Sequence, residues 1–371
     1  MERPVRIEVQ RQDLTRLLNG ITRVVETSNA VPVLRNVVLS SSGGTLTARG
    51  TNLDIEITTS CPCSEGDLTA CVPAHKMADI VKRMAGDVVT MEFVPGVAED
   101  TGDLVVKSGR SRFNVPSIPS KWFPTLAEKE YDNTFTADLS LLFQPVMSSV
   151  MADNDAKRYL CGVYLHTIDG KLRAVGADGP RMAIYDTDAP DGAVGMPGVI
   201  VSTKVAALAI AFKAPIDVSV CATRIRLVAP GTEICAKLIE GTYPDYARVV
   251  PQANNRMLRV DKAELASAVG RVGVVASESA GKPIRLNIAP GSIHLVAKDS
   301  DGREAVDEVA IEFDGEPTFV AYNTKFLDDM LAAVPGDTVE FDITDNTTTT
   351  RVRSVSDAAF VGVLTPFRMA A

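Results

Sequence analysis

The side chains most able to carry chemistry in this sequence are its six cysteines and three histidines. Cys61, Cys63 and Cys71 lie close together, but they form no Cys-x-x-Cys pair. Cys61 and Cys63 would project from the same face of a strand, where two small buried thiols are expected as readily as reactive ones. The spacing of zinc ligands is absent. The histidines lie far apart, at His75, His166 and His294. We therefore expect neither a metal site nor a catalytic dyad.

The sequence also lacks the common motifs of enzymes. It contains no phosphate-binding loop, no Gly-x-Ser-x-Gly and no His-Glu-x-x-His. Adjacent carboxylates such as Asp328 and Asp329 imitate an acid–base pair, but their position on a polar helix face predicts that they are solvated. The chain is therefore expected to have no cofactor and no catalytic activity.

The composition is that of a globular protein, with 46% hydrophobic and 23% charged residues among 371. This length predicts two or three domains. No apolar run approaches the roughly 18 residues of a membrane span, and the first residues lack the apolar segment of a signal peptide. Cysteines without a disulfide pattern fit a reducing compartment. A cytoplasmic location is therefore expected.

An apolar stripe at helical spacing occurs three times at an even stride. Its copies begin at Leu14, Leu139 and Leu265, which are 125 and 126 residues apart. The second copy runs from Leu139 to Val150. A second helical stripe recurs at offsets of 128 and 122 residues, beginning at Met77, Val205 and Leu327. The chain therefore consists of three diverged copies of one unit.

Each copy contains strands as well as helices. Alternating apolar and polar residues follow turn signals, as in residues 45–49 after Gly43-Gly44. Each helical stripe must be buried against such a sheet. The predicted fold class is α+β, with three tandem copies of a two-helix, multi-strand domain at residues 1–125, 126–253 and 254–371. A chain of this kind either forms a linear array or closes by pairing with other copies.

Seven short segments lie in a fixed order along the chain. They are PVLRNV at 32–37, GTNLDIEI at 50–57, SGRSRF at 108–113, YLCG at 159–162, ADGPRMA at 177–183, GTYPDY at 241–246 and LTPFRM at 364–369. In this order they resemble the β subunit of bacterial DNA polymerase III, the sliding clamp. The resemblance implies a head-to-tail homodimeric ring of six domains, with strands outside and helices around duplex DNA. Such a ring does no chemistry and confers processivity by tethering the polymerase.

The formal charge of −9 argues at first against a nucleic-acid partner, but the distribution of charge matters more than its sum. A ring linked topologically to DNA needs no strong phosphate affinity, because each neutralised phosphate adds to binding and would impede sliding. The resemblance implies DNA-facing residues at Arg23, Lys82, Arg83, Arg158, Tyr159 and Lys204. The alternative is that these are ordinary solvated positions.

The charge differs between the three copies. It is 0 over residues 1–125, −3 over 126–253 and −6 over 254–371. In the family, the first domain of one subunit meets the third domain of the other, which implies charged rims around an apolar centre. The interface residues expected are Lys107, Arg110, Arg112 and Val115 on one side, with Val274, Val275, Asp301, Glu304, Asp307 and Glu308 on the other. The alternative for residues 301–308 is an ordinary charged loop.

The family also binds short linear peptides in an apolar pocket between its second and third domains. The peptides come from the DNA polymerase III α subunit, the clamp loader, other polymerases and repair factors. The matching positions here are Leu160, Ala177, Gly179, Pro180, Arg181, Met182, Pro244, Val249, Phe326, Thr347, Thr349, Val363, Thr365, Pro366, Phe367, Arg368 and Met369. Such a groove suits a Leu or Phe anchor. From the residues alone, Met182 and Val363 are more readily interpreted as core residues.

Two departures from the family pattern, Ala177 and Pro180, predict a drier pocket wall with fewer hydrogen bonds. Two other interpretations stay open at this point. One is a scaffold built from the same repeats that does not bind DNA, and the other is a duplicate, drug-insensitive clamp.

Overall fold

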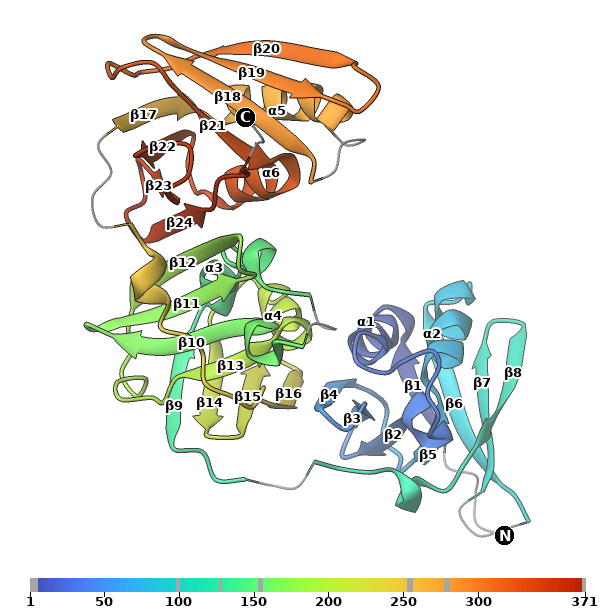
Figure 1. Ribbon diagram of the computed structural model, residues 1–371. Helices are drawn as coiled ribbons and strands as arrows, with labels where there is room; N and C mark the ends of the chain where they lie inside the picture. The colour runs from blue at the N-terminus through green and yellow to red at the C-terminus, as the bar shows by residue number, and fades with distance from the viewer. Residues whose placement is uncertain are drawn as a thin grey trace. The chain divides into compact units, whose positions relative to one another are not determined.

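The computed structural model describes residues 6–97, 101–126, 129–152, 156–251, 256–276 and 281–368 (Figure 1). Within these ranges the chain forms α-helices joined by many short antiparallel strands. The helices are α1 (Arg11–Thr22), α2 (Ala74–Arg83), α3 (Leu139–Phe143), α4 (Thr203–Ile210), α5 (Lys262–Ala276) and α6 (Thr324–Ala333). The α+β class predicted from the sequence is therefore confirmed.

The strands fall into three sets that follow the three sequence repeats. The first set is β1 (Arg6–Gln10), β2 (Asn36–Ser42), β3 (Thr45–Thr51), β4 (Ile55–Pro62), β5 (Thr69–Pro73), β6 (Val88–Pro95), β7 (Gly102–Ser108) and β8 (Ser111–Ser117). The second is β9 (Asn133–Ala137), β10 (Gly162–Ile168), β11 (Lys171–Ala177), β12 (Arg181–Asp188), β13 (Val199–Ser202), β14 (Ile216–Cys221), β15 (Arg224–Ala229) and β16 (Thr232–Lys237). The third is β17 (Arg256–Asp261), β18 (Pro283–Ala289), β19 (Ser292–Lys298), β20 (Glu304–Ala310), β21 (Thr318–Asn323), β22 (Thr338–Ile343), β23 (Thr350–Ser354) and β24 (Phe360–Leu364).

Sheets continue from one repeat into the next by pairing of strand edges. The two larger sheets have the orders β5-β2-β3-β4-β16-β15-β14-β9 and β13-β10-β11-β12-β24-β23-β22-β17. We call the β4–β16 pairing the first seam and the β12–β24 pairing the second seam. The two smaller sheets, β1-β6-β7-β8 and β20-β19-β18-β21, end on the edge strands β8 and β20.

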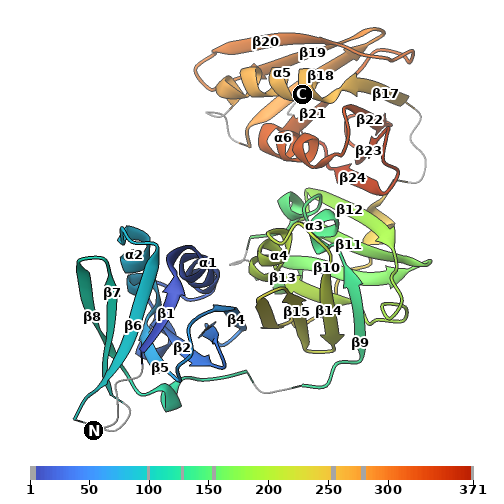
Figure 2. The same ribbon diagram turned by 180° about the vertical axis from the view of Figure 1, so that it is seen from behind.

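This continuity divides the chain into two compact units that cut across the central repeat. Unit 1 is Met1–Thr134 with Ile216–Lys237, and unit 2 is Phe135–Pro215 with Leu238–Ala371. The central repeat therefore gives β14–β16 to unit 1 and β10–β13 to unit 2. In Figure 2 the second seam can be followed within unit 2, between β12 and β24.

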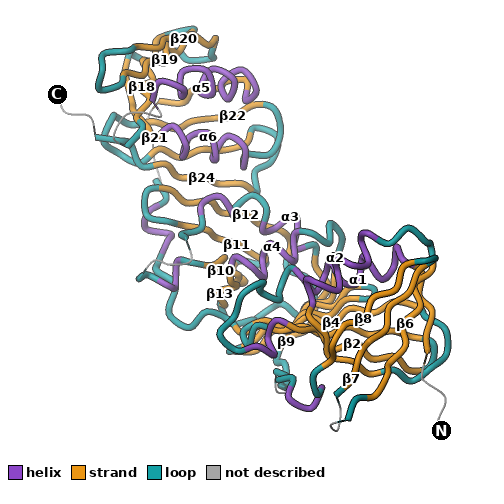
Figure 3. Tube along the Cα trace, turned by 90° about the vertical axis from the view of Figure 1, so that its right-hand side faces the viewer, coloured by secondary structure: helices purple, strands orange, loops and turns teal. Residues whose placement is uncertain are grey.

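Within each unit, helices pack in pairs on one face of the sheets. α1 contacts α2 and lies on β3 and β4, while α5 contacts α6 and lies on β18 to β20. Helices and strands form separate layers within each unit in Figure 3. The apolar stripe of α1 is fully buried, from Leu14 through Ile21. This burial against a sheet is the outcome that the helical spacing predicted.

Two helices begin with side-chain caps. The Asn323 side chain accepts a hydrogen bond from the Phe326 N–H, and Ser202 accepts one from Val205. Each cap satisfies a backbone N–H group that has no partner within its helix.

The second copy of the first helical stripe is shorter than the prediction of a helix continuing to Val150. α3 ends at Phe143, and a 3-10 turn follows at Met147–Ser149. Pro145 explains the difference, because proline has no N–H to donate and its ring clashes with the carbonyl four residues earlier. The stripe is nevertheless buried, with Val146 fully covered. Helical spacing therefore located the buried face correctly but overestimated the length of the helix.

No helix in the ranges described above is long and apolar enough to cross a membrane.

Candidate functional site

A cavity of about 520 Å³ opens in unit 2 beside the end of the second seam. Its walls come from the β11–β12 turn, the start of α6 and the chain segment after β24. Gly179 in the turn has a φ of +104°, a conformation that glycine adopts without strain. The lining residues are Gly179, Pro180, Asn323, Phe326, Thr365, Pro366, Phe367 and Arg368.

Backbone hydrogen bonds fix the segment after β24 against this cavity. The Thr365 N–H donates to the Pro180 carbonyl at 2.8 Å, and the Phe367 N–H donates to the Ala321 carbonyl at 2.7 Å. The Phe367 ring also lies so close to Gly281 that a Cβ there would approach it to 2.3 Å. The C-terminal segment is therefore part of the wall of the cavity.

A buried arginine lies behind the cavity. Arg181 is 7% exposed and donates to Asp178 at 2.9 Å and to Asp329 at 2.6 Å. Its guanidinium carbon lies 4.5 Å from the centroid of the Phe326 ring. The arginine thus joins the first residue of β12 to α6 and positions an aromatic wall of the cavity.

The pKa values of the two carboxylates that bind Arg181 are shifted in opposite directions. Burial raises the pKa of Asp178, although the bonds from Arg181 oppose that rise. Burial also acts to raise the pKa of Asp329, but hydrogen bonds from Lys325 and Arg181 outweigh it and hold that pKa below its usual value. The expectation that Asp329 is merely solvated was wrong, because α6 turns this carboxylate toward a buried cation.

An apolar cluster on the second seam joins four of the predicted pocket residues. Leu160, Met182 and Val363 are buried in it, and Ala177 packs against it. Met182 and Val363 face each other across the seam, since they are register partners in the β12–β24 pairing. The alternative that Met182 and Val363 are core residues is therefore supported by their exposures of 4% and 2%.

The other predicted pocket residues lie in three places. Val249 is half exposed in a 3-10 turn and Pro244 is exposed beside the buried Tyr243. Thr347 and Thr349 lie in the β22–β23 turn, where Thr347 bonds to Asp345. Met369 lies outside the described residues.

Three residues of this site were missed from the sequence. Asn323 lines the cavity, and Asp178 and Asp329 hold Arg181. The cap signal at Asn323 was visible in the sequence, but only the tertiary structure shows that the first turn of α6 faces the cavity. The pairing of Arg181 with Asp329 joins residues 148 positions apart, and no local pattern reveals it.

The predicted DNA-facing residues lie at helix ends and in a short turn. Arg23, Lys82 and Arg83 of unit 1 are exposed at the carboxyl ends of α1 and α2, which pack together. In unit 2, Lys204 is half-exposed in the first turn of α4. The turn Arg158–Leu160 presents an exposed Arg158 and a half-buried Tyr159.

The predicted interface residues lie on or beside the two edge strands. Residues 304–308 form most of β20, so the alternative of a charged loop is wrong for them. Arg110 and Arg112 are exposed at the start of β8, and Val274 on α5 is 70% exposed. Lys107 lies on β7, Val275 on α5 and Asp301 in the β19–β20 turn. Val115 is only 3% exposed and faces the core of unit 1, whereas Phe113 on the same strand is 38% exposed.

The acidic members of this set already have partners within the chain. Asp307 bonds to Arg271 at 2.6 Å, Glu304 to Lys298 at 3.1 Å and Asp301 to Arg303 at 2.9 Å. Glu308 lies 3.6 Å from His294, and Lys107 pairs with Glu92 at 2.9 Å. These carboxylates are already paired within the chain. Fewer acidic side chains are therefore available to a partner than the net charge of the third repeat suggests.

Cys61 and Cys71 show no chemical activation. Burial raises the pKa of Cys61 to about 11 and that of Cys71 to about 12, so both are thiols at neutral pH. No group of three or more metal-ligating side chains occurs among the residues that the structure describes.

Three repeats of a two-helix sheet domain, joined edge to edge, define a protein of the clamp class. Models of the DNA polymerase III β subunit match the chain in order: the N-terminal domain at residues 5–127, the central domain at 140–245 and the C-terminal domain at 247–368. A beta sliding clamp of Caulobacter vibrioides is 32% identical over 98% of this chain and 100% of its own length. That of Pseudomonas aeruginosa is 29% identical over 97% and 99%.

Solved structures agree with these matches. A DNA polymerase sliding clamp from Caulobacter crescentus aligns with a TM-score of 0.88 at 32% identity, over 98% of this chain and all of that one. A sliding clamp from Bartonella birtlesii bound to griselimycin aligns with a TM-score of 0.91 at 29% identity, over 99% of this chain and all of that one. The chain belongs to the DNA polymerase III β subunit family, the sliding clamps, which are non-catalytic subunits.

The Arg181 cluster gives a testable dependence of stability on pH. Asp329→Asn removes one charged partner from a buried arginine, and we expect a loss of about 1–3 kcal/mol at pH 7. Because the folded pKa of Asp329 is lowered, its contribution is present above the unfolded pKa of about 4 and is lost as pH falls through the folded value. Thermal unfolding measured from pH 7 to pH 3 should therefore show a gap between variant and parent that narrows below about pH 4.

Asp328→Asn provides the matched control, because this neighbouring residue on α6 is exposed. It should leave the unfolding temperature nearly unchanged at every pH. An equal loss in both variants, or a gap independent of pH, would show that the ion pair with Arg181 does not stabilise the site.

Proposed function

We propose that two copies of this chain close head to tail into a ring around duplex DNA and hold DNA polymerase III and other factors through the cavity of unit 2. The functional domains proposed are residues 1–125, 126–253 and 254–371. The matched ranges of the three family models support this division. The observation that supports the proposal is the pairing of strands between successive repeats.

Both seams pair equivalent strands of successive repeats. In the first seam the fourth strand of the first repeat, β4, pairs with the last strand of the second, β16. In the second seam the corresponding strand β12 pairs with β24, the last strand of the third repeat. Continuing this rule, the corresponding strand of the third repeat, β20, would pair with the last strand of a first repeat, β8. Both of these strands end their sheets, and we propose that a second copy supplies the partner of each.

Pairing β20 with β8 of another copy has a clear physical benefit. Exposed edges carry unpaired N–H and C=O groups, and adding a strand from another chain satisfies them. Phe113 on β8, Val306 on β20 and Val274 on α5 are 38%, 61% and 70% exposed, and they supply an apolar centre. We propose Phe113 for the role that the sequence gave to Val115.

The basic helix ends fit a surface that DNA passes. Lys82 and Arg83 at the end of α2 are exposed cations of unit 1, although Arg83 lies 3.8 Å from Asp79. Arg23 is exposed just after α1, at the opposite end of this antiparallel helix pair. Weak, partly compensated charge keeps the affinity for phosphates low, so that a closed ring slides. Arg158, Tyr159 and Lys204 are proposed to serve the same role in unit 2.

The cavity of unit 2 fits the anchor of a short peptide. Phe326, Pro366 and Phe367 line it with apolar surface, and the buried cluster around Met182 lies on the same seam. Exposed Arg368 and the Asn323 amide lie at its margin and provide polar contacts. This combination of an apolar wall with a few polar groups is typical of peptide and ligand pockets.

Topological binding to DNA tests the central claim. Clamps assembled on a nicked circular plasmid by a clamp loader should stay on that plasmid in 0.5 M NaCl, because release requires opening of the ring. Linearising the plasmid should release them within minutes. Gel filtration of the two samples measures this directly. Equal retention on both forms would contradict encirclement and favour a scaffold that does not bind DNA topologically.

Closure of the ring is tested at Phe113. Phe113→Glu should shift the chain from dimer to monomer in light scattering at low micromolar concentration, because it places a charge in the proposed apolar centre. Val194→Glu is the matched control, since Val194 is 72% exposed and belongs to the segment between β12 and β13, which is part of neither edge strand. A dimer that survives Phe113→Glu unchanged would exclude the β8–β20 pairing.

Peptide binding is tested by deleting residues 367–371. We expect at least a tenfold loss in affinity for a polymerase-derived peptide, measured by fluorescence anisotropy, because Phe367 and Arg368 line the cavity. The deletion should leave the dimer intact. Loss of the dimer would mean instead that this segment is structural. Val194→Ala, remote from the cavity, should bind the peptide as the parent does.

A further inference from the structure

A row of polar side chains crosses three neighbouring strands of unit 2. His166 on β10 is the register partner of Arg173 on β11, which is in turn the partner of Asp186 on β12. Arg173 donates to both carboxylate oxygens of Asp186, at 2.6 and 2.7 Å. His166 is only 9% exposed. We call these three residues the polar row.

The polar row borders the apolar cluster of the second seam. On β12, Asp186 lies on the same face as Ile184 and Met182, because side chains two residues apart in a strand point to the same side. Ile184 and Met182 are buried in that cluster together with Val363. The face that carries the apolar cluster therefore becomes polar at this row.

Part of the chain between β16 and β17 contacts both parts of this face. The Tyr243 ring is buried in the apolar cluster and stacked on that of Tyr164, with centroids 4.6 Å apart and planes 4° apart. Tyr246 contacts the polar row instead. Its hydroxyl oxygen lies 2.8 Å from His166 Nε2 and 3.3 Å from an Arg173 nitrogen. The two tyrosines therefore fasten this part of the chain to the sheet.

The donors and acceptors at the Tyr246 hydroxyl determine the state of the histidine. A guanidinium group can only donate, so Arg173 donates to the Tyr246 oxygen. The phenol hydrogen is then left for His166 Nε2, which accepts it only when the imidazole is neutral. A protonated ring carries hydrogens on both nitrogens and would place a second donor and a second cation against Tyr246. Protonation therefore removes the hydrogen bond that Tyr246 donates.

The groups around His166 keep its ring neutral at pH 7. Burial lowers the pKa of His166, and the Arg173 charge acts in the same direction, whereas a hydrogen bond with the Thr167 backbone and the Asp186 charge oppose them. Burial raises the pKa values of the two stacked tyrosines, so both stay uncharged. Because the ordinary pKa of histidine is about 6.5, His166 is the group of this set that gains a charge in mild acid.

The first repeat has an equivalent segment with different contacts. The positions that match the polar row, 126 residues earlier, are also register partners and carry no ionisable group: Ser40, Thr47 and Ser60. Phe123-Pro124 corresponds to Tyr243-Pro244, so Leu126 takes the place of Tyr246. Neither half of the contact between histidine and tyrosine is therefore present in the first repeat.

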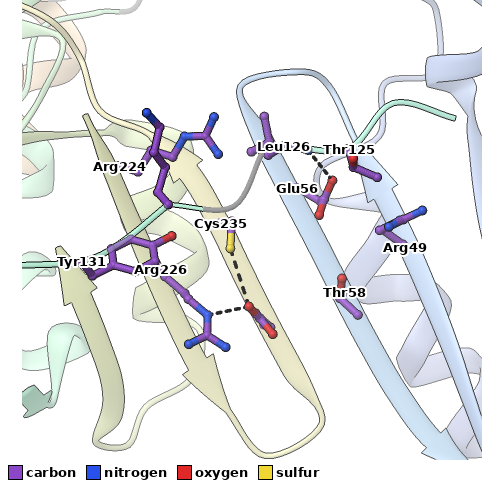
Figure 4. A pocket seen from close by; sticks show the side chains of 11 residues that line it. Arg49, Glu56, Thr58, Thr125, Leu126, Tyr131, Arg224, Arg226 and Cys235 are labelled. Atoms are coloured by element: carbon purple, nitrogen blue, oxygen red, sulfur yellow. Dashed lines mark hydrogen bonds and ion pairs between the residues drawn. The ribbon is translucent and has the colours of Figure 1, made fainter. Parts of the chain in front are cut away.

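A cavity of about 560 Å³ lies beside this segment at the first seam (Figure 4). Arg49, Leu126 and Arg224 are among the residues that line it. The Leu126 N–H donates to Glu56 at 3.0 Å, and the Arg49 guanidinium lies 5.7 Å from the centroid of the Phe123 ring. The segment of the first repeat is thus held by contacts that do not involve a histidine.

We propose that Tyr246 is a positioning residue for peptide binding and that neutral His166 holds it in place. This inference rests on the peptide-binding role proposed above. Tyr246 begins the 3-10 turn Tyr246–Val249, and Val250 packs against the apolar cluster. Val249 and Pro244, two residues expected to contact the peptide, are exposed on either side of Tyr246 in the chain. Releasing the Tyr246 hydroxyl lets this wall move and weakens the peptide complex.

Peptide affinity measured between pH 8 and pH 4.5 tests the proposal. Because the folded pKa of His166 is lowered, the bond from Tyr246 is intact above about pH 6.5 and is lost as the pH falls through the folded value. NMR of the imidazole protons gives that midpoint directly. In fluorescence anisotropy we expect affinity for a polymerase-derived peptide to fall about fivefold with the same midpoint, which corresponds to the loss of one hydrogen bond.

Two substitutions separate the histidine from the tyrosine. His166→Gln should bind within about twofold of the parent at pH 8 and lose the pH dependence, because its amide oxygen accepts from Tyr246 and does not titrate. Tyr246→Phe keeps the ring and removes the hydroxyl, so it should bind about fivefold more weakly at pH 8, with no pH dependence.

Tyr185→Phe is the matched control for the tyrosine. It removes a hydroxyl that donates to Asp357 at 2.8 Å, and it lies on the opposite face of β12 from Asp186. We expect it to lower the unfolding temperature as Tyr246→Phe does but to leave peptide affinity unchanged. A difference between these two variants in affinity, with similar stability, distinguishes a positioning role from a purely structural one.

Several outcomes would overturn the inference. They are an affinity that stays constant through the His166 midpoint, a His166 ring that stays neutral down to pH 4.5, a pH dependence that persists in His166→Gln, and a Tyr246→Phe variant that binds as tightly as Tyr185→Phe. If the parent binds no peptide at pH 8, the peptide-binding role fails together with this inference. If the parent binds at pH 8 and any of the other outcomes is found, this inference alone fails.

Discussion

The need of every strand edge for a hydrogen-bonding partner is the constraint on which this structure depends. The fourth strand and the last strand of each repeat present an edge whose N–H and C=O groups would otherwise be exposed. The chain pairs β4 with β16 and β12 with β24, so four of these edges are satisfied internally. β8 and β20 are left at the ends of their sheets. Head-to-tail association is the extension of the same pairing to a second copy.

The two seams show how one architecture serves different chemistry. Backbone pairing fixes which positions face away from the helices, but it places no demand on their side chains. The second seam presents Met182 and Val363 at one such pair, and the first seam presents Glu56 and Cys235. Duplication therefore supplied equivalent positions whose side chains diverged, apolar in the second seam and more polar in the first.

A buried charge gives the cavity of unit 2 its definite shape. Arg181 would be costly to bury alone, but Asp178 and Asp329 compensate it from β12's own turn and from α6. The same guanidinium lies over Phe326 and holds this ring at the cavity. Moving α6 away from β12 would break the ion pair between Arg181 and Asp329, so the cluster specifies how these elements dock.

The sequence by itself determined the threefold repeat, the helical stripes and the family. These follow from periodic patterns and ordered motifs, because local spacing reports which face of an element is buried. The sequence predicted too long a helix at α3. The apolar stripe continues past Pro145, whereas the helical backbone cannot. The sequence also located the cavity residues around Pro366 and Phe367 through their resemblance to the family.

Only the tertiary structure decided the contacts between distant segments. The ion pair of Arg181 with Asp329, the burial of Val115 and the exposure of Phe113 depend on which strand pairs with which and in what register. The cavity at the first seam was equally invisible, since Arg49 and Arg224, which both line it, come from different repeats. Local spacing carries no information on such pairs, because their proximity is created by the pairing of β4 with β16.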